Sequence, residues 1–155
     1  MKKIIAVALM ICILFSFAYA DLDEKTLITY NACASVLGAP QLEGECKSEN
    51  DYVLYQINSL LIGFELSPTS NIRSGFIYSD DDTNSADFLC SGMAMISFLG
   101  ETDMTAFGML LMQYGRTRSG QDSVPYTLGM DQFQVVNSNA AKYSFIYMNN
   151  DNKTK

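Results

Sequence analysis

Apolar residues recur at intervals of about three to four positions along much of the chain, which is the spacing of one face of an α-helix. The first such segment, residues 22–37, stops at Gly38 and Pro40, residues that end helices. The second follows Ser48 and Asp51, where a serine with an acidic residue behind it is typical of a helix start. Its stripe comprises Val53, Leu54, Ile57, Leu60, Leu61 and Phe64. We predict a helix over each segment.

Two shorter segments with the same spacing follow, and the run they form contains five methionines. One extends from near Ser85 to Gly100, and the other from Thr102 or Asp103 to Tyr114. Each is only about three turns long, whereas a membrane-spanning helix needs about 20 apolar residues. We therefore predict two short helices joined by a bend and not a membrane hairpin.

The C-terminal region has a different pattern. Residues 133–136 and 143–147 are rich in aromatic and β-branched side chains and bracket the turn-forming residues 137–139, which is typical of a β-hairpin. Two further helices fit nearly as well, so the structure of residues 126–148 stays open. The pattern as a whole predicts a mainly α-helical single domain over residues 21–148, a small bundle of four or more helices, followed by a polar tail at 149–155.

The first twenty residues have the features of an export signal. Lys2 and Lys3 precede an apolar run at residues 4–17, and Ala18 to Ala20 supply small residues at a cleavage site. This order is typical of a secretory signal peptide. We expect cleavage after Ala20, a periplasmic product, and no membrane insertion after cleavage.

The net charge of the chain restricts the classes of molecule that it can bind. The formal net charge is −7, with 10 basic and 17 acidic residues, and loss of Lys2 and Lys3 with the leader would make it −9. An acidic protein repels nucleic acid and anionic lipid headgroups. We expect neither of these as a partner, whereas a cationic or neutral protein remains compatible.

Three cysteines would remain after cleavage, at positions 33, 46 and 90. An odd number in an oxidising compartment predicts one disulfide and one thiol, and all three pairings are open. We favour Cys33 with Cys46, because both flank the turn at residues 38–40 and could join two neighbouring helices. Cys90 would then be a small apolar residue within a helix, or the site of an intermolecular bridge.

The residue types exclude most catalytic chemistry. The chain contains no histidine, which removes the usual general base, the usual partner of a nucleophile and the commonest zinc ligand. We assign no catalytic residue, metal ligand or cofactor. Two alternatives stay open, a copper-binding protein using the thioethers of Met109 and Met112 and a cell-wall enzyme that uses carboxylates only.

The connection between the second and third predicted helices is long, spanning residues 67–84. A connection of this length within a domain is often functional, and aromatic residues beside charges are typical of protein-contact surfaces. A short strand packed on the core explains the aromatic residues equally well. The predicted contact residues are Arg73, Phe76, Ile77, Tyr78, Asp80, Asp81 and Asp82.

The order of these features resembles a known family. Cys33 lies in the first predicted helix, Cys46 precedes the predicted helix at residues 55–63, and Cys90 precedes the helix that begins at Thr102. With the signal peptide and the small acidic body, this is similar to the periplasmic immunity proteins of type VI secretion, particularly the amidase-immunity (Tai) group. The likeness covers residues 27–114, and no late cysteine follows Cys90 to complete a second bridge.

The resemblance implies a function. Proteins of that group bind and block a cell-wall-degrading effector, often as dimers. We therefore expect a non-enzymatic periplasmic inhibitor that covers the active-site cleft of a peptidoglycan hydrolase, with residues 72–82 making the contact and a homodimer as its assembly.

Overall fold

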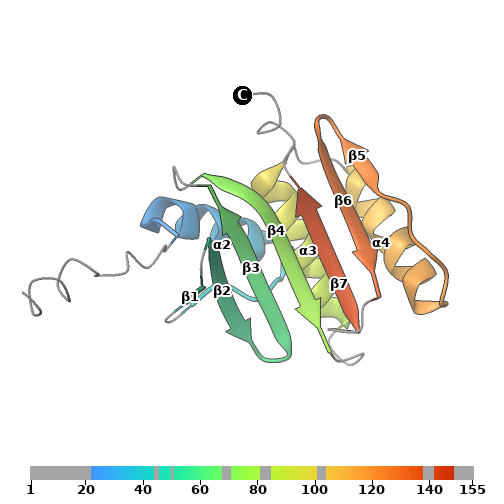
Figure 1. The fold of residues 1–155 in the computed structure, drawn as a ribbon, viewed down its shortest axis with the longest axis horizontal. Coiled ribbons are helices and arrows are strands. Elements are labelled where there is room, and N and C mark those ends of the chain that lie inside the picture. The colour runs from blue at the N-terminus through green and yellow to red at the C-terminus, as the bar shows by residue number, and fades with distance from the viewer. Residues whose placement is uncertain are drawn as a thin grey trace, which may run out of the picture.

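Three helices lie on one face of a seven-stranded antiparallel sheet, in the part of the chain that the structure describes (Figure 1). The structure is a computed structural model that describes residues 22–43, 46–49, 51–67, 71–80, 85–100, 104–137 and 142–148. The leader and the polar tail predicted from the sequence lie outside these ranges. In chain order the elements are α2 (Glu24–Leu37), β1 (Lys47–Glu49), β2 (Tyr52–Ile57), β3 (Leu60–Leu66), β4 (Ile72–Ser79), α3 (Ser85–Leu99), α4 (Met104–Arg118), β5 (Tyr126–Leu128), β6 (Asp131–Val136) and β7 (Tyr143–Met148).

The strand order is β1-β2-β3-β4-β7-β6-β5, and every neighbouring pair is antiparallel. The chain leaves the sheet after β4, forms α3 and α4, and returns through the far edge at β5. The last strand, β7, then enters between β4 and β6. This topology places residues from the middle and the end of the chain side by side at the centre of the sheet.

The prediction of a mainly helical bundle is wrong, because the segment predicted as the second helix is a β-hairpin. Residues 52–57 and 60–66 form β2 and β3, which pair around a turn in which Asn58 has a φ of 52°. Asparagine tolerates this left-handed conformation in tight hairpin turns. Within β3, Leu60, Ile62 and Phe64 are all buried and point to the helices, which is the alternation of a strand.

The structure confirms the other three predicted helices. Helices α2, α3 and α4 occupy the segments predicted as helical, and β6 pairs with β7 as the C-terminal hairpin. The ends of α2 follow from local chemistry. Asp23 Oδ1 accepts a hydrogen bond of 2.7 Å from the Thr26 amide, and Gly38 adopts a φ of 68° at the other end. An acidic N-cap and a left-handed glycine are common helix boundaries.

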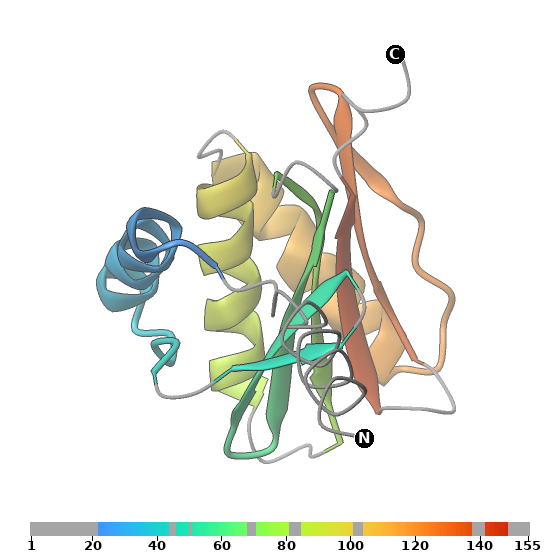
Figure 2. The same ribbon diagram turned by 60° about the vertical axis from the view of Figure 1, so that its left-hand side comes forward.

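The core lies between the helices and the sheet, and small residues allow the two layers to approach. Figure 2 shows α3 between α2 and the middle of the sheet. Tyr30 of α2 is fully buried and makes edge-to-face contacts with Phe64 and Phe98. A Cβ on Gly75 of β4 would lie 2.4 Å from the sulfur of Met95, so α3 packs where Gly75 has no side chain.

Helix α4 also completes the backbone hydrogen bonding of the sheet. Its Gln113 side chain is buried, accepts a 2.7 Å hydrogen bond from the Val135 amide of β6, and donates one of 3.0 Å to the Val124 carbonyl. The short edge strand β5 pairs with β6 only over residues 131–133. Gln113 therefore takes the place of a neighbouring strand beyond the end of β5, satisfying polar groups that would be costly to bury unpaired.

No disulfide joins the cysteines of the described residues, so the predicted Cys33–Cys46 bridge is absent. The prediction assumed that Cys33 and Cys46 flank a turn between two neighbouring helices. Cys46 instead leads into β1 at the edge of the sheet, whereas Cys33 lies in α2. Among the described residues, no helix has the length and apolar character required to cross a membrane.

Candidate functional site

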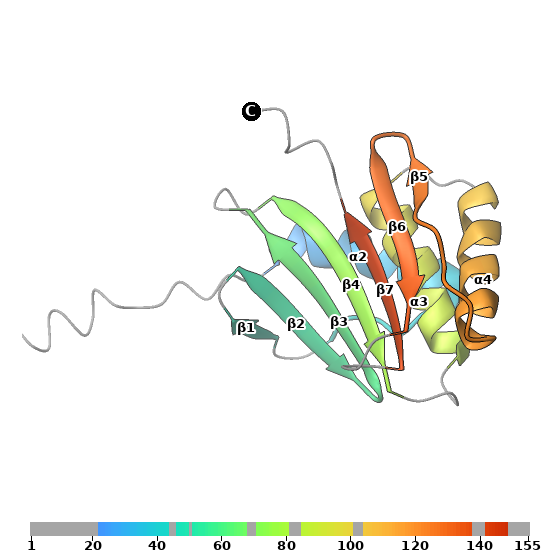
Figure 3. The ribbon, with the colours of Figure 1, turned by 45° about the vertical axis from the view of Figure 1, so that its right-hand side comes forward.

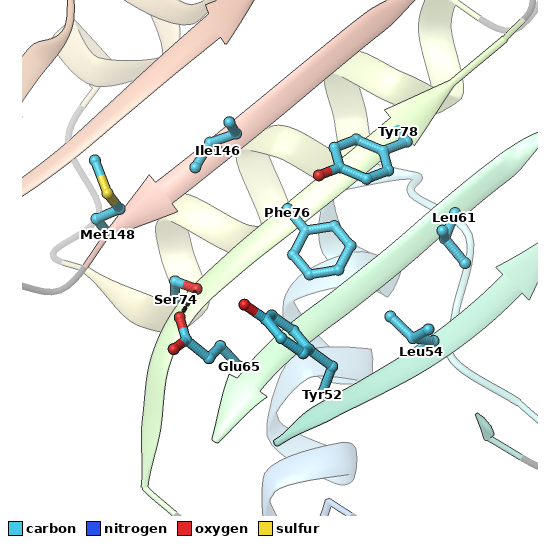
Figure 4. Close-up of a pocket in the computed structure, with 9 residues that line it drawn as sticks. All are labelled: Tyr52, Leu54, Leu61, Glu65, Ser74, Phe76, Tyr78, Ile146 and Met148. Atoms are coloured by element: carbon cyan, nitrogen blue, oxygen red, sulfur yellow. Dashed lines mark hydrogen bonds between the residues drawn. The ribbon is translucent and has the colours of Figure 1, made fainter. Parts of the chain in front are cut away.

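The face of the sheet opposite the helices is hollowed. Figures 1 and 3 show the helices behind the sheet, with the front of β2, β3, β4 and β7 uncovered. The hollow has a volume of about 500 Å³. It is lined by Tyr52, Leu54, Leu61, Glu65, Ser74, Phe76, Tyr78, Ile146 and Met148 (Figure 4). Most of these side chains are apolar, so this face departs from the polar outer surface usual for a one-sided antiparallel sheet.

Cross-strand pairing arranges these residues in rows. One row, read across four strands, consists of Tyr52, Glu65, Ser74 and Met148. The adjacent row consists of Leu54, Gly63, Phe76 and Ile146. Since directly opposed residues on one face are in side-chain contact range, the rows form a continuous surface from β2 to β7.

Phe76 is the centre of the hollow, and a glycine determines where its ring lies. A Cβ on Gly63, its partner on β3, would be 2.1 Å from Phe76 Cζ, so the ring lies over the glycine backbone. The ring contacts Tyr52 at a centroid distance of 6.0 Å and Tyr78 at 4.9 Å. These three rings form an aromatic cluster that is open to solvent on one side.

Glu65 is the single carboxylate among the described residues that line the hollow. Its Oε2 accepts a 2.9 Å hydrogen bond from the Ser74 hydroxyl, which holds the side chain on the face beside Tyr52 (Figure 4). Because Glu65 is flanked by aromatic rings and aliphatic side chains, the hollow combines one negative charge with apolar contact area. This combination suits a cationic group that carries apolar substituents.

The structure brings two of the predicted contact residues into this site and separates the others. Phe76 and Tyr78 line the hollow, whereas Ile77 points to the opposite side and is buried in the core. Arg73 is exposed where the β3–β4 register shifts, and Asp80 is exposed just after β4. Asp81 and Asp82 lie outside the described residues. The predicted contact loop is therefore largely a central strand, and its alternation divides the predicted set between two faces.

Sequence reasoning missed most of the lining. Tyr52, Leu54 and Leu61 lie in the segment predicted as a helix, and neither Ile146 nor Met148 is among the predicted contact residues. The reading that could have found them is a strand over residues 60–66, with 60, 62 and 64 on one face and 61, 63 and 65 on the other, although apolar residues on both faces conceal this alternation in the sequence. That reading would have placed Leu61 and Glu65 on a common outer face.

The side chains that most often bind metals do not cluster in the described residues. They contain no group of three or more His, Cys, Asp or Glu side chains placed to hold an ion. The two methionines considered for copper have different surroundings, since Met109 packs against the core and Met112 is 46% exposed. Burial and, less strongly, the nearby Asp87 carboxylate raise the pKa of the Cys90 thiol, which disfavours the thiolate that binds metals.

Comparisons of the chain with protein-family models, curated proteins and solved structures found no match. The fold and site themselves define the class of protein. It is an α/β domain whose antiparallel sheet is covered by helices on one face and carries an aromatic hollow on the other.

Proposed function

We propose that this chain is a non-enzymatic, periplasmic inhibitor that binds a partner protein through the hollow of its sheet and blocks that partner's active site. The observation that carries the proposal is the apolar and aromatic lining of a sheet face that no described element covers. Open apolar surfaces with clustered aromatic residues are typical of protein contact sites.

The chemistry of the hollow favours binding over catalysis. Carboxylate-only hydrolysis needs two acidic groups about 5–10 Å apart, whereas the described lining supplies Glu65 alone. Ser74 donates its hydroxyl hydrogen to Glu65, and the histidine that usually activates a serine nucleophile is absent from the chain. The described side chains therefore offer contact area and one charge.

The same side chains indicate what the partner presents. Tyr52, Phe76 and Tyr78 provide ring faces and edges for apolar side chains, and Glu65 provides one anchor for a lysine or arginine. A cation beside aromatic rings gains both the ion pair and cation–π attraction. The acidic charge of the whole chain, −7, would steer a basic partner surface toward it.

The class of partner comes from the sequence resemblance, which implies a cell-wall-degrading effector. The helical body implied by the same resemblance is not found, so the partner class depends on the leader and the cysteine-bearing segments alone. The contact surface is also revised. In place of a loop at residues 72–82, the outer face of β4 and its neighbours would cover the rim of the hydrolase cleft.

Capture of the partner from the native envelope, followed by affinity measurement with the purified pair, tests this proposal. Phe76→Ala removes the central ring, and Ile28→Ala is the matched control because Ile28 is an exposed apolar residue on α2. We expect the Phe76 variant to weaken binding by about tenfold or more and the control to bind like the wild type. Equal binding by both variants, or digestion of peptidoglycan by the purified protein alone, would overturn the proposal.

A further inference from the structure

The hollow is too small to be the whole contact surface for a protein partner. Nine residues line it, whereas a protein interface of standard size involves about 20–30 residues on each side. The contact must therefore continue over the neighbouring surface. On the outer face of the sheet it can continue past β2 towards β1, or past β7 towards β6 and β5.

The side towards β1 has the wrong charge for a basic partner. Lys47 of β1 is directly opposite Leu54 of β2, and opposed residues share a face of the sheet. Because Leu54 lines the hollow, the exposed Lys47 is on the outer face just beyond it. A partner that presents a lysine or arginine to Glu65 would be repelled by a like charge at this edge.

The side towards β6 continues the surface of the hollow. Gln134 of β6 is opposite Ile146, which lines the hollow. Val136 of β6 is opposite Ser144, which is in turn opposite Tyr78 of the hollow. Opposed residues share a face, so β6 extends two rows of the hollow across the sheet. A second cavity, with a volume of about 630 Å³, begins at Gln134 and Val136.

The chain between α4 and β5 forms the other wall of this second cavity, which we call the polar pocket. Residues 120–123 line this wall, and Asn137 lies beside Val136 at the end of β6. Figure 2 shows the connection from α4 to β5 standing out from the sheet on the side away from α2 and α3. The polar pocket is therefore on the same side of the sheet as the hollow.

Hydrogen bonds hold the wall of the polar pocket in place. The Gln134 side-chain amide donates a 2.7 Å hydrogen bond to the Ser123 carbonyl, and the Ser123 hydroxyl donates to the Val135 carbonyl. At the other end, the Gln121 amide donates a 2.9 Å hydrogen bond to the Arg116 carbonyl of α4. The wall is thus tied to both β6 and α4. A pocket formed in advance lowers the entropy lost on binding.

The charge of the polar pocket indicates its occupant. Asp122 is the single charged residue among the described residues that line it, and it is exposed. Arg116 and Arg118, in the last turn of α4, lie outside the lining. Gln134 uses its amide hydrogens on Ser123, which leaves its carbonyl oxygen as an acceptor. A pocket with acceptor oxygens and one negative charge suits a guanidinium, which carries a positive charge and five N–H donors.

We infer that the polar pocket is a second subsite for the same partner and binds an arginine side chain, while Glu65 in the hollow binds another basic group. This inference rests on the proposed function, since it takes the hollow as the main contact site of the partner. Gln134 is three strands away from Glu65 and one row further along. With strands about 4.8 Å apart and rows about 6.8 Å apart, the two basic groups of the partner should be about 16 Å apart.

Titration with N-acetyl-arginine amide, followed by ¹H–¹⁵N NMR of the purified protein, tests the inference without the partner. We expect saturable shifts at the backbone amides of residues 121–123 and at the side-chain amide of Gln134. Asp122→Asn should weaken this binding by about twofold to fivefold, the usual effect of losing one exposed charge pair. Glu24→Gln, which removes an exposed carboxylate in the first turn of α2, is the matched control and should bind like the wild type.

Three results of the titration would overturn the inference. The first is the absence of saturable shifts at the polar pocket. The second is equal weakening by Asp122→Asn and Glu24→Gln, because the probe would then respond only to the net charge of −7. The third is equal binding of the uncharged N-acetyl-glutamine amide, which would exclude a cation as the occupant.

The captured partner provides a second test, which separates this inference from the proposed function. The affinity of the partner should fall for Asp122→Asn as well as for Phe76→Ala. A partner whose binding is weakened by Phe76→Ala but not by Asp122→Asn would overturn the second subsite and leave the proposed function standing. A partner whose binding is insensitive to both substitutions would overturn both.

Discussion

Replacing Gly63 with alanine should disable the hollow through a single methyl group. The Cβ of alanine at this position would lie 2.1 Å from Cζ, 2.5 Å from Cε2 and 2.7 Å from Cε1 of Phe76. Non-bonded carbon atoms prefer about 3.5–4.0 Å, so the ring must move outward by more than about 1 Å. Phe76 would then lose its present contacts with Tyr52 and Tyr78.

The effect on stability should be small and the effect on binding large. Inserting a methyl group where another side chain lies destabilises the fold by about 1–3 kcal/mol. Replacing a glycine in a strand by alanine stabilises the fold by about 0.5–1 kcal/mol in the absence of such a clash. Because Phe76 is only half-buried, its ring can move into solvent, and we expect a net destabilisation of about 0–2 kcal/mol. Loss of a central aromatic contact costs about 2 kcal/mol in binding, or about a 30-fold weaker Kd.

A double-mutant cycle with Phe76→Ala separates this mechanism from a general backbone effect. Once the ring has been removed, Gly63→Ala has nothing to displace and should leave the Kd unchanged, while urea unfolding should show equal or slightly higher stability. Partner affinity by calorimetry and unfolding free energy by urea titration are measured for all four proteins. If the two substitutions add independently, the claim that Gly63 acts by positioning Phe76 is refuted.

Three further predictions concern stability and can be tested without the partner. Gln113→Leu leaves a backbone amide of β6 and a backbone carbonyl without their hydrogen bonds, and urea unfolding should show a loss of about 2–4 kcal/mol; a loss below about 0.5 kcal/mol would contradict the role given to Gln113. The methyl group added by Gly108→Ala, on α4, would have no atom within 4 Å, so this substitution should stabilise the fold by about 0.5–1 kcal/mol. A lower free energy of unfolding for this variant would contradict the prediction. The hydrogen bonds from Thr26 hold the pKa of Asp23 below its usual value. This stabilisation is present above about pH 4 and is lost as the pH falls through the lowered pKa. Between pH 2.5 and 6, the melting temperature of the Asp23→Asn variant should therefore change less with pH than that of the wild type. Identical pH profiles for the two proteins would show that the Asp23 carboxylate does not stabilise the start of α2.

The parts of the fold that the sequence predicts are those with strong local signals. The predicted end of α2 is confirmed at Gly38, whose left-handed conformation closes the helix by local chemistry. The C-terminal hairpin has a weaker signal, because its β-branched and aromatic residues favour strands but two helices fit residues 126–148 nearly as well. These signals act within a few positions along the chain, so tertiary contacts are not needed to read them.

The β2–β3 hairpin was misread because the candidate site lies on it. Buried residues such as Val53 and Ile62 face the helices, but Leu54 and Leu61 are also apolar and face the hollow. Apolar residues on both faces conceal the alternation of a strand, and their spacing happens to fit a helical stripe. Local rules fail most often where residues serve function rather than folding. The composition of residues 67–84 is enough to select Phe76 and Tyr78 of β4 as contact residues. The lining residues on the neighbouring strands can be placed beside them only from the strand pairing.

Site-specific photo-crosslinking in the native envelope tests the central claim most directly. A photoreactive phenylalanine derivative is placed at Tyr78, which lines the hollow, or at Ile28, which is exposed on α2. The account predicts that position 78 crosslinks to a single partner protein and that position 28 does not crosslink to that protein. A partner that crosslinks from position 28 but not from position 78, or no protein crosslinked from position 78, would contradict it.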